Sequence, residues 1–498
     1  MRVLILPILF TILLAPAINA DPGDLHELGL KGIDFTHDMQ YDEAIKLFDE
    51  MIRLEPENAM GYTFKAACHF SIYTDERKHG KRFLDVSYKA IDIAKPMLAE
   101  KKDDINAMFY LGSIYGKLGM YYLDNKSYLK AYWYGTKAIK YLKKAVKLDP
   151  DYYDAYIGLG VYDYSVSTLP KIVKSLSFLL GSHGDRNDGL DEIKLAADKG
   201  IYAKDDAKII LITIYIEYEN DYDAAIPLLK EMIAKFPHTP INKKDLAKCY
   251  RHQKKHDLSI RILTEAQQST SFNEYPLIHS QLCYDLGETY FEMNKYDQAI
   301  WALKNVLRLS RYKDELESSL YASTLFFIGN IYEMMGLAET ANEYYSQIKK
   351  ADNKAAYKDA RARINNPLTP VQIQFKRGKN YLKCGENAQA RSIFNGILEA
   401  GLNKKSPDKT FTGELYYYLG RTEYESKEYQ TAIRIFNKIL SLEDITSDWI
   451  KPWTHYFLGN CYKNTGDYEK AKEAYGIACK YDDSAIILAV DRAMKEME

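Results

Sequence analysis

Residues 455–478 read His455-Tyr-Phe-Leu-Gly-Asn-Cys-Tyr462, then a turn at Asn464-Thr-Gly-Asp467, then Tyr468-Glu-Lys-Ala-Lys-Glu-Ala-Tyr475 and Ala478. Apolar and small residues recur three and four positions apart on both sides of the turn, which is the spacing of an amphipathic helix. The stretch therefore predicts two antiparallel helices joined by a short turn. The small residues let the two helix axes approach closely.

The same frame recurs along almost the whole chain. A Gly-x-x-Tyr step marks a first helix at Gly112, Gly287, Gly329 and Gly378, and an alanine marks the second helix twelve residues further on in most units. Prolines such as Pro56 follow several second helices, since proline cannot continue a helix. The chain is therefore predicted to be an array of helix pairs.

This pattern resembles the tetratricopeptide repeat (TPR), a helix–turn–helix unit of about 34 residues. The resemblance implies an all-α, right-handed solenoid of about eleven helix pairs. It also implies a concave groove that binds a polypeptide. Ser484–Glu498 has Ile486, Ile487, Val490 and Met494 on one face and is expected to be the C-terminal capping helix.

The predicted organisation follows the regularity of the repeats. It comprises a signal peptide at 1–20, irregular TPR units at 21–200 with an insertion at 165–186, a regular array at 201–364, a loop at 365–370, a second array at 371–483 and the capping helix at 484–498. The third unit has about fourteen extra residues between its small-residue landmarks, so its two helices are expected to be long.

The first twenty residues have the composition of a secretory signal peptide. Arg2 precedes the apolar run Val3–Leu14, and small residues lead to Ala20. The alternative is a short membrane anchor, although the run is short for a spanning helix. No cysteine follows the run, so lipid attachment is not expected. The sequence thus predicts export to the bacterial periplasm or cell envelope.

Composition narrows the classes of partner. The chain has 67 basic and 69 acidic residues, and this net charge of −2 gives no sign of nucleic acid or an anionic membrane as a partner. Cys68, Cys249 and Cys461 occupy slots where this repeat usually has alanine, and the six cysteines include no CxxC pair. Buried free thiols are therefore expected, with a disulfide between neighbouring units as the alternative.

A row of aromatic residues is the candidate binding surface. In five successive units the residue three positions before the glycine of the first helix is aromatic. The residue one position after that glycine is polar in all five. The aromatic residues are Tyr284, Phe326, Phe375, Tyr417 and Tyr456, and the polar residues are Glu288, Asn330, Lys379, Arg421 and Asn460. We call this set the aromatic ladder. It is expected to bind a protein or peptide, and packing between neighbouring helices is the alternative.

The fourth unit is the most individual segment. It contains Leu169-Pro170, an apolar stretch ending at Gly181, and Gly184-Asp-Arg-Asn-Asp-Gly-Leu190. In these features Ala107–Gly200 resembles tetratricopeptide repeat protein 39, the inclusion body clearance proteins and uncharacterised exported bacterial TPR proteins. The residues of Leu169–Leu180 themselves predict a short amphipathic helix. It is expected to pack as a plug against neighbouring helices, and the alternatives are a lid or a peripheral membrane contact.

Sequence motifs for catalysis or metal binding are weak. The glycines at 181–189 lack the P-loop spacing and its lysine. His252 and His256 lie four apart among cations, which favours a solvated basic turn over a metal site. Lys244, Lys248 and Arg251 form a basic strip on one first helix. Some repeats of this kind bind the C-terminal carboxylate of a partner with Lys, Asn and Arg side chains. The next helix here has Glu288 and Glu292 instead, so this type of binding is not expected.

The function expected from the sequence is a non-enzymatic protein-interaction scaffold. No cofactor, no metal and no nucleic acid is expected, and membrane contact would be at most peripheral. The alternative is an enzyme, or a module binding a glycan or small ligand, that uses the insertion at 165–190.

Overall fold

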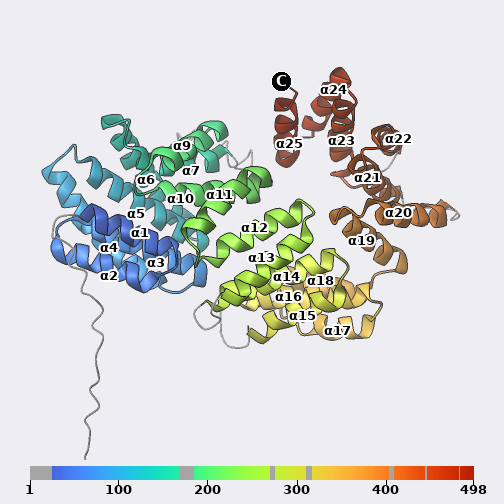
Figure 1. The fold of residues 1–498 in the computed structure, drawn as a ribbon, viewed down its shortest axis with the longest axis horizontal. Coiled ribbons are helices and arrows are strands. Elements are labelled where there is room, and N and C mark those ends of the chain that lie inside the picture. The colour runs from blue at the N-terminus through green and yellow to red at the C-terminus, as the bar shows by residue number, and fades with distance from the viewer. Residues whose placement is uncertain are drawn as a thin grey trace, which may run out of the picture. The chain divides into compact units, whose positions relative to one another are not determined.

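The computed structural model describes residues 25–167, 184–269, 275–309, 317–402, 409–442, 446–481 and 483–497. All regular structure in these ranges is helical, as Figure 1 shows. The helices are α1 (Leu25–His37), α2 (Tyr41–Leu54), α3 (Ala59–Glu76), α4 (Gly80–Glu100), α5 (Ile105–Asp124), α6 (Tyr128–Leu148), η1 (Tyr153–Ala155), α7 (Tyr156–Ser167), α9 (Arg186–Lys199), α10 (Lys204–Thr213), η2 (Ile214–Glu219), α11 (Tyr222–Lys235), α12 (Pro240–His252), α13 (His256–Ser269), α14 (Pro276–Glu292), α15 (Tyr296–Leu309), α16 (Glu317–Met334), α17 (Ala338–Ser346), α18 (Lys354–Asn365), α19 (Pro370–Lys383), α20 (Asn387–Leu402), α21 (Lys409–Glu425), α22 (Tyr429–Leu440), α23 (Ile450–Asn464), α24 (Tyr468–Cys479) and α25 (Ser484–Lys495).

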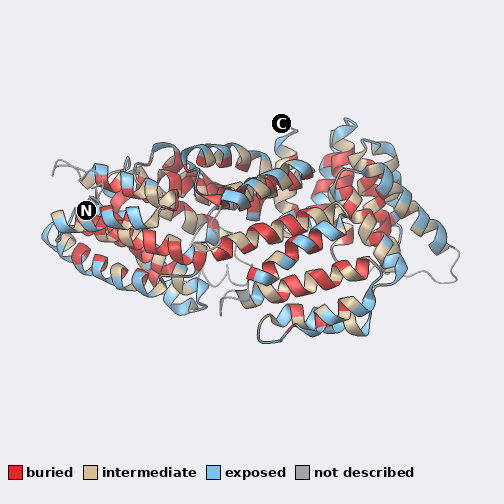
Figure 2. Cartoon of the chain, turned by 60° about the horizontal axis from the view of Figure 1, so that its bottom comes forward, coloured by how far each residue is buried: buried red, intermediate tan, exposed pale blue. Residues whose placement is uncertain are grey.

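The helices form pairs in chain order, which confirms the predicted all-α array. The chain divides into two compact units: the first is built on α1 to α7, and the second contains the helices from α10 to the C-terminus together with most of α9 and the end of α3. Within each unit, successive helices pack against each other. Buried residues follow the sides of the helices that face their neighbours (Figure 2).

In most of the regular pairs a glycine on the first helix packs closely against a large side chain on the second. A Cβ added to Gly378 would lie 2.5 Å from Cε1 of Phe394, and one added to Gly420 would lie 2.6 Å from Cε1 of Phe436. Both phenylalanines are fully buried. The absence of a side chain therefore sets how closely the two helices pack.

The turn inside each pair uses a left-handed residue. Asn294, Lys427 and Gly466 have φ values of 56°, 63° and 80°, and each lies between the first and second helix of its pair. This region favours glycine and tolerates asparagine. The predicted turn at Asn464-Thr-Gly-Asp467 is therefore explained by its backbone conformation.

The long third helix pair and the C-terminal capping helix are both present. The long third pair is confirmed, since α5 has 20 residues and α6 has 21. The capping helix is also confirmed: Ile486 and Val490 of α25 are buried against Tyr475 and Ala478 of α24.

The predicted loop at 365–370 corresponds to residues 366–369, which connect α18 to α19. The single helix α18 before this loop was not predicted, because it does not belong to a two-helix unit. Ala356 and Ala360 of α18 are buried against the α16–α17 pair. The insertion at 165–186 falls largely on residues 168–183, outside the described residues.

Candidate functional site

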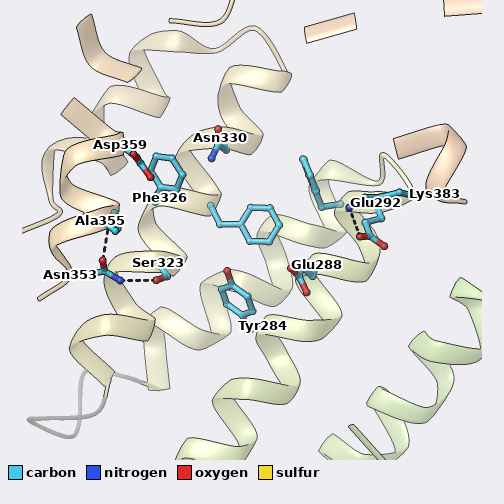
Figure 3. Close-up of a pocket in the computed structure, with 13 residues that line it drawn as sticks. Tyr284, Glu288, Glu292, Ser323, Phe326, Asn330, Asn353, Ala355, Asp359 and Lys383 are labelled. Atoms are coloured by element: carbon cyan, nitrogen blue, oxygen red, sulfur yellow. Dashed lines mark hydrogen bonds and ion pairs between the residues drawn. The ribbon is translucent and has the colours of Figure 1, made fainter. Parts of the chain in front are cut away.

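A pocket of about 420 Å³ lies in the second unit, where α14, α16 and α18 meet. Figure 3 shows its lining side chains converging from these three helices, with Lys383 at the end of α19. Tyr284, Phe291, Phe326 and Phe327 supply the aromatic part of the lining. We call this the α14–α18 pocket.

The aromatic side chains of the pocket contact each other. The ring centroids of Phe291 and Phe327 are 5.1 Å apart in an edge-on arrangement, and those of Tyr284 and Phe327 are 5.8 Å apart. Phe326 lies 5.5 Å from Tyr345, which is buried. These contacts fix the aromatic lining on the helix pairs beneath it.

Small and polar residues of α18 form the opposite wall. Asn353 accepts a hydrogen bond from the Ala356 amide at 3.0 Å and donates one to the Ser323 hydroxyl at 3.3 Å. These bonds cap α18 and tie its first turn to α16. Ala355 lines the pocket and is exposed, so the wall leaves room beside the aromatic rings.

The rim of the pocket has three carboxylates, and two of them are paired with cations. Glu288, Glu292 and Asp359 line it, against the single cation Lys383. Glu288 pairs with Arg251 of α12 at 2.5 Å, and Glu292 pairs with Lys383 at 2.8 Å. Asp359 of α18 is exposed and adds a third carboxylate.

Burial and neighbouring charges shift several pKa values here. Burial, with the nearby Glu288 carboxylate, raises the pKa of Tyr284 to about 12, so its hydroxyl stays protonated. Burial alone would raise the pKa of Glu292, but the hydrogen bond to His256 and the charges of Lys383 and Arg251 outweigh it and lower the pKa to about 2. Glu292 is therefore ionised over the physiological range.

The aromatic ladder divides into two groups. Four of its members, Tyr284, Glu288, Phe326 and Asn330, line the α14–α18 pocket. The sequence pattern thus contained these residues. The pattern did not include Phe327, which follows Phe326 directly. It also did not include the α18 residues, because α18 is a single helix without the Gly-x-x-Tyr step of a repeat unit.

The remaining aromatic members pack against neighbouring helices. Phe375 is buried against Phe411, with centroids 5.2 Å apart, and Tyr417 is buried against Trp449 at 5.0 Å. Tyr456 is partly buried, 6.1 Å from Tyr475. A partner role for these three side chains stays a prediction.

Their polar companions also have contacts within the chain. Asn460 is buried and accepts a hydrogen bond of 2.6 Å from the Tyr475 hydroxyl. Lys379 lies over the Phe375 ring at 4.9 Å, and Arg421 lies over the Phe457 ring at 5.0 Å. These contacts make the second group part of the repeat packing.

The two histidines have different surroundings, and the expected solvated basic turn is wrong for His256 only. His256 is buried, with Nε2 3.2 Å from Glu292 and 3.7 Å from the Cys384 thiol. His252 is exposed but stacks on Tyr222 at 4.3 Å, and the partial cover of its ring together with the nearby Arg251 lowers its pKa to about 4. In the parts of the chain that are described, no group of three or more His, Cys, Asp and Glu residues is placed to hold a metal ion.

The basic strip of α12 is already paired. Lys248 contacts Glu217 at 2.6 Å, in addition to the Arg251–Glu288 pair.

The cysteines are free thiols, as predicted, and burial raises the pKa of Cys68, Cys249 and Cys461 to about 12. Within the described ranges, no helix has the length and apolar character of a membrane span.

Comparison with protein families locates repeats in three parts of the chain. A tetratricopeptide repeat model matches residues 452–485, and a second model of the same repeat matches residues 136–152 and 280–312. The last match contains most of α14, which forms one side of the pocket.

Two curated relatives are similar over parts of the chain. The TPR repeat-containing protein MJ1428 of Methanocaldococcus jannaschii is 26% identical over 265 residues, which cover 51% of this chain and 41% of that protein. Tetratricopeptide repeat protein 29 of Macaca fascicularis is 22% identical over 176 residues, covering 35% and 36%. The chain therefore matches well under half the length of either relative.

Among solved structures, the TPR domain of P58(IPK) is similar. The alignment covers 94% of this chain and 97% of the P58(IPK) chain, at 14% sequence identity and a TM-score of 0.21. At that TM-score the likeness carries no weight for this chain. The resemblance of Ala107–Gly200 to one subgroup of the repeat family stays a prediction.

Proposed function

Because this chain is a tetratricopeptide-repeat protein, we propose that it is a protein-interaction scaffold that binds a polypeptide segment at the α14–α18 pocket. TPR arrays present a continuous surface built from successive units, which suits extended partners. The observation that carries the proposal is the convergence of Tyr284, Phe326, Glu288 and Asn330 on one cavity.

The dimensions and chemistry of the cavity suit a peptide anchor. A volume of about 420 Å³ lies within the range of ligand pockets and accommodates one or two large side chains. Aromatic residues bind such anchors at low entropic cost. Glu288 and Glu292 are paired with Arg251 and Lys383, so the exposed Asp359 is the carboxylate that favours a basic residue beside the apolar anchor of the partner.

A pair of matched substitutions tests this proposal. Ala355 and Ala338 are both exposed alanines in the first turn of a helix, but only Ala355 lines the pocket. We expect Ala355→Trp to obstruct the pocket and reduce capture of the partner polypeptide at least tenfold, while Ala338→Trp leaves it unchanged. Affinity capture with quantitative mass spectrometry measures both. Equal capture by the two variants would refute the pocket as the binding site.

We also propose that the chain is exported to the periplasm or cell envelope of a bacterium after removal of Met1–Ala20. The support is the order of Arg2, the apolar run Val3–Leu14 and the small residues before Asp21. N-terminal sequencing of the protein from its own host should give Asp21 or a close neighbour as the first residue. A cytosolic pool that keeps Met1–Ala20 would contradict export.

We expect no enzymatic activity. The rival hypothesis, an enzyme or a glycan- or small-ligand-binding module at 165–190, falls mainly outside the described residues. Binding of a small molecule that is unaffected by Ala355→Trp would favour the rival.

A further inference from the structure

The α5–α6 hairpin, with helices of 20 and 21 residues, is longer than the regular pairs of the second unit. Gly112 and Ala138 are 26 residues apart, whereas the corresponding Gly287 and Ala299 are 12 apart. The added residues lengthen the end of α5 and the start of α6. Packing within the pair does not require them, because the shorter pairs form the same glycine contact.

The end of this hairpin exposes large apolar side chains. Leu129 is 88% exposed and Trp133, one turn further along α6, is 51% exposed. Met120 and Leu123 lie one turn apart on α5 and are also exposed. We call these residues, with Tyr128 and Tyr132, the hairpin tip. Isolated exposed apolar residues are ordinary, but a cluster of this kind marks a contact surface.

Aromatic contacts hold one flank of the hairpin tip in place. The Tyr88 hydroxyl of α4 lies 2.9 Å from that of Tyr122, and the Tyr122 and Tyr134 rings stack with centroids 5.3 Å apart. Trp133 contacts Tyr134 edge-on at 4.7 Å. The exposed side chains therefore extend from a packed base and not from a loose loop.

The second helix of the hairpin is strongly basic. α6 carries Lys130, Lys137, Lys140, Lys143, Lys144 and Lys147 and has neither Asp nor Glu. The net charge of −2 for the whole chain conceals this local excess. Lys137 lies 3.3 Å from the Trp133 ring centre, so charge and apolar surface adjoin each other.

We propose that the hairpin tip inserts into the interfacial region of an anionic lipid bilayer, with the α6 lysines on the lipid headgroups. Tryptophan and tyrosine concentrate at membrane–water interfaces, and leucine and methionine side chains partition further inward. Lysines near the surface add electrostatic attraction to anionic lipid. A nucleic acid would use the lysines but gives no role to Leu129 and Met120, so the bilayer is the favoured partner.

Vesicle binding tests this proposal with the full chain. We expect co-sedimentation with vesicles of phosphatidylcholine and phosphatidylglycerol, and little with phosphatidylcholine alone. Leu129→Ser with Trp133→Ser should reduce the partition coefficient about tenfold or more. Both side chains are exposed, so the variant should fold normally.

The matched control is Leu337→Ser with Trp301→Ser, which removes a leucine and a tryptophan that are exposed elsewhere in the chain. All variants keep Val3–Leu14, so any lipid binding by that apolar run is common to them. The control pair should bind vesicles like the native chain. Absence of native binding, or equal binding by the hairpin variant and the control, would overturn the proposal. Binding to RNA or to an acidic protein without vesicle binding would overturn it as well.

Discussion

At the scale of single residues, the glycine of each first helix defines how its pair packs. Gly420 faces the ring of Phe436, which is fully buried. By contrast, Gly476 lies inside α24 with no atom within 4 Å of an added Cβ. Glycine lowers helix stability relative to alanine by the same intrinsic amount at both positions. The effect of a substitution therefore depends on the surroundings of each glycine.

We expect Gly420→Ala to lower the free energy of unfolding by about 1–3 kcal/mol, because the new methyl group forces the Phe436 ring aside. Gly476→Ala should raise it by roughly 0.5–1 kcal/mol through higher helix propensity. Urea unfolding followed by circular dichroism measures both. Changes of the same sign in the two variants would show that the glycine contact is not limiting.

The ion pairs of Glu292 predict a pH dependence. Its pKa is about 2 in the folded chain against 4.5 for a free glutamate. A carboxylate with a lowered pKa stabilises the fold above the unfolded pKa, and this contribution is lost as pH falls from about 4.5 towards 2.

Glu292→Gln should therefore be less stable than the native chain near neutral pH, by roughly 2–3 kcal/mol as an upper estimate. The difference should shrink as the pH falls below about 4. Thermal melts of both proteins across this range test it. Asp359→Asn, which removes an exposed carboxylate of the same pocket, is the control and should change little. A constant difference at every pH would assign the effect to packing instead of charge.

The aromatic ladder shows what residue patterns predict and what they leave open. Tyr284 and Tyr417 occupy the same position relative to their glycines, and the sequence identified both. Their surroundings differ because Trp449 covers Tyr417, whereas Tyr284 faces the pocket. The covering residue comes from another repeat unit, so the register within one unit does not contain that information.

At the scale of elements, α18 is the feature that the sequence pattern did not predict. It lacks the Gly-x-x-Tyr step and a second helix, and Pro367 and Pro370 follow it closely. Its alanines, lysines and arginines favour a helix, and Asn353 caps it. Pattern matching to a two-helix unit could not find a single helix. The regular pairs and the capping helix α25 were predicted because each repeats or terminates the shared pattern.

The capping role of α25 gives a prediction at this scale. Ile486 is fully buried against α24, while Ile487 beside it is partly exposed. We expect Ile486→Ala to cost about 2–5 kcal/mol and to promote self-association, since the last pair would lose its cover. Ile487→Ala should cost clearly less. Thermal unfolding and light scattering compare them, and similar behaviour of both variants would remove the capping interpretation.

At the scale of the whole molecule, two surfaces with different chemistry stand out. The second unit has the acidic, aromatic α14–α18 pocket, and the first unit has the basic hairpin tip. The net charge of −2 reveals neither of them, because it is a sum over the whole chain. The two proposals are independent: Ala355→Trp should not change vesicle binding, and Leu129→Ser with Trp133→Ser should not change capture of the polypeptide.

The central claim is that a polypeptide occupies the α14–α18 pocket, and site-specific photo-crosslinking tests it most directly. A photoreactive residue would replace Ala355 in one chain and Ala338 in another, followed by irradiation in the native host. We predict a polypeptide adduct from position 355, with the crosslink mapped to one partner segment, and none above background from position 338. No adduct at 355, or the same adducts from both positions, would contradict the claim.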